Sequence, residues 1–208
     1  MIEIQSDIEQ HKVIAILRNV PPERLKQVLE ALYEGGIRLA EITLNSPGAL
    51  TGIAAMSEAF EGRLILGAGT VMNKDEAKHA IQAGAQFLIS PHVDEGIIDV
   101  ALAHSILPLP GALTPTEIVR AMDAGAPYIK LFPCSAVGVG YVKELLGPFH
   151  TCKLIAVGGI NENNAAGYIS AGAVGVGVGS SLVSVDDIQH EKFEAITSRA
   201  IKITESIK

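Results

Sequence analysis

Two charged side chains stand inside runs of residues that otherwise suit buried strands. Lys130 lies in YIKLFP (128–133), and Glu41 lies in LAEITL (39–44). Such side chains are rarely buried without a partner, because the charge must leave water. Burial lowers the pKa of a lysine amine, and the neutral amine is a nucleophile that condenses with a carbonyl to form an imine. A carboxylate beside that imine could move protons at the neighbouring carbon, so both residues are candidate catalytic groups.

A structural role is the alternative for each residue. Lys130 could extend its amine from a strand end into water, and Glu41 could be a buried partner that neutralises Lys130 or Arg18. The two interpretations of Glu41 are compatible, since a paired carboxylate can still act as a base. A lone lysine in a strand would favour the structural role, but the elements around Lys130 favour catalysis.

Eight short apolar runs begin 20 to 26 residues apart along the chain. They are VIAILR (13–18), LAEITL (39–44), LILGAGT (64–70), FLISP (87–91), LPLPGA (107–112), YIKLFP (128–133), LIAVGG (154–159) and VGVGVGS (174–180). This spacing suits one strand, one helix and two short loops per unit.

The segments between the runs carry helical signals. ERLKQVLEALYE (23–34) has an apolar stripe with helical spacing. Asn73 predicts a helix N-cap, and Thr114 with Glu117 has the spacing of a capping box. Glycine pairs or Ala-Gly pairs end four of the segments, at 35–36, 83–84, 124–125 and 171–172. The C-terminal SRAIKITESIK predicts a surface helix.

Eight alternating strand and helix units predict an α/β protein with a single (β/α)₈ barrel domain over residues 1–208. An open doubly wound sheet is the alternative, but no GxGxxG turn follows the strand at 13–18. Aliphatic residues and 21 glycines dominate and aromatic residues make up 4%, which favours parallel strands under helices.

Composition and charge exclude several kinds of partner. The formal net charge is −7, which repels the phosphate backbone of nucleic acids. No apolar run approaches the roughly 20 residues of a membrane span, and no signal peptide is visible at the N-terminus. The two cysteines form no CxxC pair and no disulfide framework. We therefore expect a cytoplasmic protein without a membrane or nucleic-acid partner.

In a (β/α)₈ barrel the active site lies where the strands end. The strand ends carry two basic groups, one carboxylate, several hydroxyls and glycine-rich turns: Arg18, Glu41, Thr43, Asn45, Thr70, Pro91, His92, Gly111, Lys130, Gly158, Gly159, Gly179 and Ser180. Arg18 could hold a carboxylate with two hydrogen bonds, or it could form an ion pair at the rim. Thr70 offers a hydroxyl at the end of GAGT.

The last two strands end in the glycine-rich sequences VGG and VGS. These turns would place backbone N–H groups beside helix N-termini, where an anion such as phosphate binds. Tight packing at the rim is the alternative for the glycines. His92 has no second ligand at a suitable spacing, so we expect neither a metal nor another cofactor. For Cys134 we expect a small buried thiol.

The motifs AILR, EITLNSP, GAGTV, SP, PG, KLFP, VGGI and VGS occur in this order between about residues 13 and 182. The set resembles the 2-keto-3-deoxy-6-phosphogluconate (KDPG) and 4-hydroxy-2-oxoglutarate aldolase family. The resemblance implies a (β/α)₈ barrel, a homotrimer and a metal-free class I aldolase. Such an enzyme cleaves a phosphorylated keto-deoxy sugar acid to pyruvate and glyceraldehyde 3-phosphate.

The resemblance also implies roles for single residues. KLFP makes Lys130 the Schiff-base lysine, and EITL makes Glu41 the general acid/base that works through a water. GAGT makes Thr70 a contact for the pyruvate carboxylate. The phosphate contacts are Gly158, Gly159, Gly179 and Ser180, and the other pocket residues are Asn45, Pro91 and Gly111.

One departure from the pattern bears on the substrate. Gluconate-type members carry an arginine at the position of Asn45 and a threonine at that of Val157. Arg18 in AILR instead makes the chain similar to the 2-keto-3-deoxy-6-phosphogalactonate (KDPGal) aldolases. We therefore predict that Arg18 takes over the carboxylate contact. The preference among KDPG, KDPGal and 4-hydroxy-2-oxoglutarate stays open.

Two other functions fit the same barrel. A metal-dependent sugar-phosphate epimerase would need His and Asp ligands at several strand ends, which the sequence lacks. A non-catalytic sugar-phosphate sensor would give no reason for burying a lysine.

Overall fold

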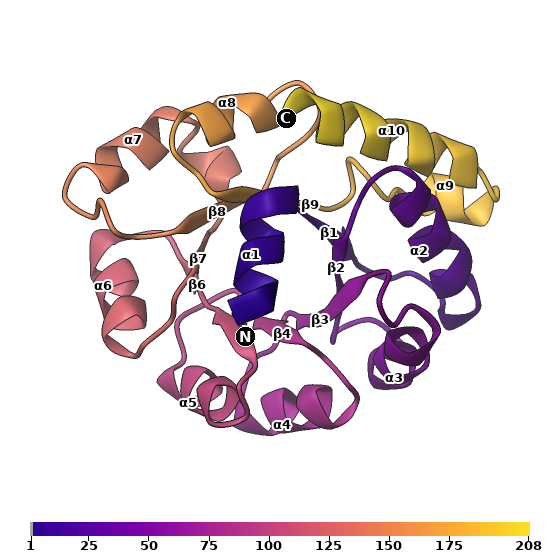
Figure 1. Cartoon of the computed structure of the whole chain (residues 1–208), viewed down its shortest axis with the longest axis horizontal. Helices are drawn as coiled ribbons and strands as arrows, with labels where there is room; N and C mark the ends of the chain where they lie inside the picture. The colour runs from indigo at the N-terminus through magenta and orange to yellow at the C-terminus, as the bar shows by residue number, and fades with distance from the viewer. Residues whose placement is uncertain (1) are drawn as a thin grey trace.

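The computed structural model describes the backbone of residues 2–208 and the side chains from Ile4 onward, so Met1 of the predicted domain lies outside the described residues. A ring of parallel strands forms the centre and helices surround it (Figure 1). The strands are β1 (Val13–Leu17), β2 (Leu39–Thr43), β3 (Ile65–Gly69), β4 (Phe87–Ile89), β5 (Leu107–Leu109), β6 (Gly111–Ala112), β7 (Ile129–Leu131), β8 (Leu154–Val157) and β9 (Gly175–Val178). They form one sheet in the order β5-β4-β3-β2-β1-β9-β8-β7-β6.

The sheet closes where β5 and β6 follow each other in the chain. The sequence predicts one strand over 107–112, but the structure divides it at Pro110, which has no N–H to donate to a ladder. β5 pairs with β4, and β6 pairs with β7. The backbone N–H of Lys130 donates to the Pro110 carbonyl at 2.9 Å, so the hydrogen bonds to β7 continue across the break. The predicted (β/α)₈ barrel is confirmed, with its fifth strand in two pieces.

Helices cover the outside of the barrel (Figure 1). The α-helices are α1 (Ile2–His11), α2 (Leu25–Glu34), α3 (Ala49–Ala59), α4 (Lys74–Gln82), α5 (Glu95–Ala103), α6 (Pro115–Asp123), α7 (Gly140–Leu146), α8 (Ala165–Ser170), α9 (Val185–Gln189) and α10 (Phe193–Ser206), and the 3₁₀ turns are η1 (Pro22–Arg24) and η2 (Cys134–Ala136).

The predicted helix signals are confirmed. The Asn73 side chain accepts hydrogen bonds from the backbone N–H groups of Asp75 and Glu76. Thr114 and Glu117 form the capping box. The closing glycines Gly36, Gly84, Gly125 and Gly172 all have positive φ, which a residue with a Cβ adopts only at a cost.

Two layers of buried side chains follow from the alternation along each strand. In β3, Leu66 and Ala68 face the helices, whereas Ile65 packs with the inner layer. The inner layer fills the barrel and consists mainly of isoleucine, leucine and the ring of Phe87. The barrel interior is therefore a packed core, and a polar group inside it has little access to water.

Helix α1 closes the N-terminal end of the barrel, a feature that the sequence pattern does not reveal. It crosses the barrel axis in Figure 1, and Ile8 is 1% exposed within the inner layer. The Tyr128 hydroxyl donates to Glu9 Oε1 at 2.8 Å, and Lys153 Nζ lies 2.6 Å from the same oxygen. With this end covered, the barrel opens to solvent at the C-terminal ends of its strands.

Within residues 2–208, no helix is long and apolar enough to cross a membrane.

Candidate active site

Lys130 lies in the middle of β7 and points into the barrel. It is 5% exposed, and its Nζ lies 5.0 Å from the centre of the Phe132 ring. Burial lowers the pKa of the amine, and the positive charge of Arg18 lowers it further, while Glu41 opposes both. Burial is the largest cause, and the lowered pKa makes the neutral, nucleophilic form of the amine more accessible than in a solvent-exposed lysine.

Glu41 lies in the middle of β2 and is 1% exposed. Its Oε2 is buried and accepts no hydrogen bond from the described residues. Burial raises the pKa of this carboxyl group, and the positive charges of Lys130 and Arg18 partly oppose the rise. Glu41 and Lys130 line the same small cavity inside the barrel. A carboxyl group with a raised pKa beside an amine with a lowered pKa is suited to general acid–base chemistry.

A cavity of about 480 Å³ opens above Lys130 at the C-terminal ends of the strands. Eight of the eleven residues predicted for the site line it: Arg18, Thr70, Pro91, Lys130, Gly158, Gly159, Gly179 and Ser180. Glu41 is not in this lining but shares the small inner cavity with Lys130. The volume is typical of a site for a small metabolite.

Arg18, Asn45 and Thr70 form one polar cluster at the mouth. The Arg18 guanidinium donates to Asn45 Oδ1 and to Thr70 Oγ1, both at 3.4 Å. Asn45 thus contacts the cavity only through Arg18. Thr70 has φ of 56°, a strained conformation for a β-branched residue, and such strain is concentrated at functional sites. The cluster presents a positive charge and a hydroxyl above the buried lysine.

The turns after β8 and β9 form another part of the cavity wall. Gly158 and Gly159 have φ of 102° and 74°, so these positions require glycine. In the described chain, the backbone N–H groups of Gly159 and Ser180 donate to no protein acceptor. Helices α8 and α9 begin only at Ala165 and Val185, so the predicted placement beside helix N-termini is wrong. An anion here would bind to loop N–H groups and the Ser180 hydroxyl.

The remaining predicted residues lie at or below the rim. Gly111 is buried outside the cavity lining, and a Cβ there would lie 2.5 Å from the carbonyl carbon of Pro91. His92 Nδ1 is buried without a hydrogen-bond partner in the described residues. Burial raises the pKa of Cys134 to about 11, which agrees with an unreactive buried thiol.

Several lining residues were not predicted. Apolar side chains and one further hydroxyl complete the cavity: Ile16, Phe132, Val157, Ile160, Gly177 and Ser181. Ser181 donates to the Ile160 carbonyl at 2.5 Å and joins the two glycine turns. Its position next to Ser180 was the only sequence signal.

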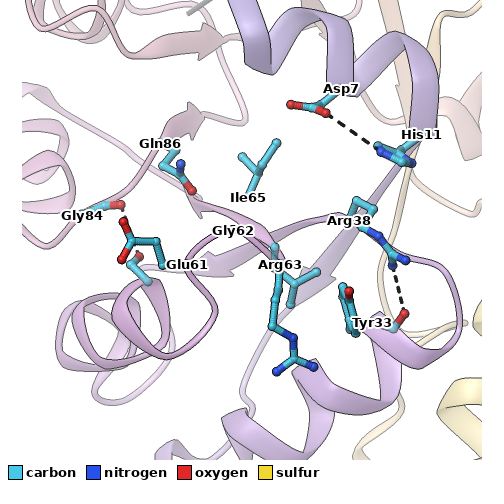
Figure 2. Close-up of a pocket in the computed structure, with 12 residues that line it drawn as sticks. Asp7, His11, Tyr33, Arg38, Glu61, Gly62, Arg63, Ile65, Gly84 and Gln86 are labelled. Carbon is cyan, nitrogen blue, oxygen red and sulfur yellow. Dashed lines mark hydrogen bonds and ion pairs between the residues drawn. The ribbon is translucent and has the colours of Figure 1, made fainter.

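A second cavity of about 540 Å³ opens on the opposite face, beside α1 and the start of β3 (Figure 2). Four of its charged or ionisable groups, Asp7, His11, Arg38 and Arg63, already have partners. Arg38 donates to the Tyr33 carbonyl at 3.0 Å and stacks on the Tyr33 ring at 4.2 Å. His11 and Asp7 lie 4.0 Å apart. The N-terminal face of such barrels mainly serves stability, so the smaller cavity above Lys130 is the candidate active site.

Comparisons with known proteins agree with this geometry. Residues 4–199 match the family model described as "Aldolase: KDPG and KHG aldolase". The 2-dehydro-3-deoxy-6-phosphogalactonate aldolase of Escherichia coli is 34% identical over 82% of this chain and 83% of its own. The 2-dehydro-3-deoxy-phosphogluconate aldolase of Treponema pallidum is 32% identical over 95% of this chain and 94% of its own.

A solved structure shows the same fold with a covalent intermediate. The KDPG aldolase of Legionella pneumophila, with pyruvate captured at low pH as a carbinolamine, has a TM-score of 0.87 and 28% identity. The comparison covers 93% of this chain and 94% of that one. A barrel with a buried lysine and a buried carboxylate at its mouth thus defines a carbon–carbon lyase, a class I aldolase. Within that class, the chain belongs to the KDPG and KHG aldolase family.

Proposed function

We propose that this aldolase cleaves a 2-keto-3-deoxy-6-phospho sugar acid, either KDPG or KDPGal, to pyruvate and D-glyceraldehyde 3-phosphate. The observation that carries the proposal is the amine of Lys130, which is buried at the base of a cavity, has a lowered pKa and shares a small inner cavity with Glu41. The neutral form of such an amine is a nucleophile that can condense with a ketone.

The reaction begins when the Lys130 amine attacks the C2 ketone of the substrate. Glu41 assists loss of water from the carbinolamine, so that a protonated imine forms. Glu41 then removes the proton of the C4 hydroxyl, directly or through one water, and the C3–C4 bond breaks. The bond electrons move into the imine and give an enamine, while C4 leaves as the aldehyde. Protonation of the enamine and hydrolysis release pyruvate and restore Lys130.

The mouth of the cavity supplies the two binding ends. Arg18 and the Thr70 hydroxyl line the cavity together and hold the substrate carboxylate. The free N–H groups of Gly159 and Ser180 also line the cavity and hold the phosphate. A substrate with a carboxylate at one end and a phosphate at the other satisfies both sets of groups.

4-Hydroxy-2-oxoglutarate is the alternative substrate, and its cleavage gives pyruvate and glyoxylate. This acid has no phosphate group to accept hydrogen bonds from the free N–H groups of the glycine turns. We therefore favour the phosphorylated acids. The homotrimer stays a prediction from the family resemblance, and a molar-mass measurement in solution tests it.

Borohydride reduction in the presence of pyruvate tests the proposal. We expect a reduced pyruvate adduct on the peptide that contains Lys130, found by mass spectrometry, and none in Lys130→Met. Cleavage rates on KDPG, KDPGal and 4-hydroxy-2-oxoglutarate then rank the substrates. A folded wild-type protein without the adduct would refute the mechanism. A faster rate on 4-hydroxy-2-oxoglutarate would refute the phosphate assignment, and ligand binding without turnover would favour the sensor.

A further inference from the structure

Gly69 ends β3 and faces the inside of the barrel, on the same side as Ile65 and Gly67. Its φ lies outside the left-handed region that requires glycine. The backbone at this position would therefore accept any residue, and glycine in a strand is less stable than alanine. The reason for a glycine must lie in the space that a side chain would fill.

The carboxylate of Glu41 occupies that space. A Cβ on Gly69 would lie 2.5 Å from Cδ, 2.6 Å from Oε1 and 2.7 Å from Oε2 of Glu41. The carboxylate therefore lies directly against the backbone of β3. Oε2 is buried and accepts no hydrogen bond from the described residues, so no such bond holds it away from β3.

We propose that Gly69 is a positioning residue for catalysis, because the absence of its side chain lets the carboxylate of Glu41 reach the place from which it serves Lys130. The inference rests on the proposed function, in which Glu41 is the general acid/base. It assigns a purpose to the second glycine of GAGT that is separate from any contact with substrate.

A methyl group at residue 69 would move the end of Glu41 and little else. All three of the atoms nearest to the added Cβ belong to the flexible end of this one side chain. At Gly111, by contrast, an added Cβ meets the backbone of Pro91, so the barrel itself would have to shift. Gly69→Ala should therefore fold with a displaced carboxylate, and a displacement of about 1 Å can cost a catalytic group about 100-fold in rate.

Gly67 provides a matched control on the same strand and the same face. The three atoms nearest to an added Cβ there all belong to the Phe87 ring, at 2.3 to 2.6 Å, whereas at Gly69 all three belong to Glu41. Gly67→Ala should lower the thermal midpoint whether or not Glu41 is intact, because the ring cannot move away within the packed core.

The experiment is a double-mutant cycle of Gly69→Ala with Glu41→Ala, assayed by kcat and KM for cleavage of KDPG and KDPGal. We expect Gly69→Ala to lower kcat about 100-fold with KM within about threefold of the wild type, and Glu41→Ala to lower kcat by about 10²- to 10⁴-fold. In the Glu41→Ala background, Gly69→Ala should cost nothing further, because the group that it displaces is gone.

Thermal midpoints give a second readout if Gly69→Ala folds poorly. Any loss of midpoint in Gly69→Ala should disappear when Glu41→Ala is added, whereas the loss in Gly67→Ala should persist. A folded Gly69→Ala with wild-type kcat would overturn the inference, and so would an equal rate loss in both backgrounds. A wild-type rate in Glu41→Ala would instead refute the proposed role of Glu41, which keeps the two failures distinct.

Discussion

The buried amine and carboxylate should make the barrel less stable than the same barrel with apolar side chains at these two positions. Lys130 is 5% exposed and Glu41 is 1% exposed, so both charged forms lose most of their hydration. Methionine follows the same unbranched path as either side chain and carries no charge. The double variant Lys130→Met/Glu41→Met thus removes both charges and keeps the interior filled.

The expected gain in the free energy of unfolding follows from known replacements of buried charges. Exchanging a buried ion pair for apolar residues of similar volume is neutral or stabilises a protein by about 1–4 kcal/mol. With a slope of about 3 kcal/mol per molar urea, the denaturation midpoint should rise by up to about 1.3 M. Each single variant should be less stable than the double variant, because it leaves one buried ionisable group without its opposite charge.

The pH dependence gives an independent check. The pKa of Lys130 is lowered from its ordinary value of 10.5, so between the folded pKa and 10.5 the unfolded chain binds more protons and stability rises with pH. The pKa of Glu41 is raised from 4.5, so between 4.5 and the folded pKa the folded chain binds more protons and stability falls as pH rises. Both slopes should be absent in the double variant.

Urea denaturation followed by circular dichroism, from about pH 5 to about pH 9, measures both effects. The aldolase activity of the double variant should be lost. A double variant that is less stable than the wild type at neutral pH would refute the reasoning. An unchanged pH dependence would show that neither group has a perturbed pKa.

Three further predictions concern the mouth and the thiols. Arg18→Ala should raise KM for the keto acids about 10- to 100-fold with little change in kcat, because a hydrogen bond to a charged group contributes about 1.5–3 kcal/mol. An unchanged KM would exclude the carboxylate contact. Ser180→Ala should raise KM about 3- to 10-fold for KDPG and KDPGal but not for 4-hydroxy-2-oxoglutarate, and an equal effect on all three would contradict a phosphate contact. Burial raises the pKa values of Cys134 and Cys152 to about 11, so both thiols should resist iodoacetamide at neutral pH until urea unfolds the chain. Mass spectrometry measures the labelling, and rapid labelling of the folded protein would contradict their burial.

The barrel and the position of its mouth could be predicted because both depend on order along the chain. Eight apolar runs with helices between them leave few topologies, and parallel strands end on the same side of the sheet. Lys130 and Glu41 were recognisable because a charge inside an apolar run is conspicuous without knowledge of its neighbours. Most of the predicted residues line one cavity for this reason.

Other features depend on contacts that no local pattern encodes. The hydrogen bonds from Arg18 to Asn45 and Thr70 span 27 and 52 residues and join three loops. The positive φ of Thr70 opposes the local preference of a β-branched residue. The space at Gly69 depends on the conformation of Glu41, a side chain on the neighbouring strand.

Two features of the fold were missed for similar reasons. Ile4 and Ile8 in α1 face a surface that exists only after the barrel has closed. The break at Pro110 is visible as a proline, but its effect depends on which neighbour each half of the strand pairs with.

The site has one opening, because side chains fill the barrel and α1 covers its N-terminal end. Since one end is covered, everything that enters the mouth must also leave by it. In the proposed reaction, pyruvate stays joined to Lys130 at the bottom while the aldehyde lies between it and the rim. The aldehyde must depart before pyruvate can follow, and in the reverse direction pyruvate must arrive first. A site with a single opening thus imposes an order on the substrates of the condensation reaction.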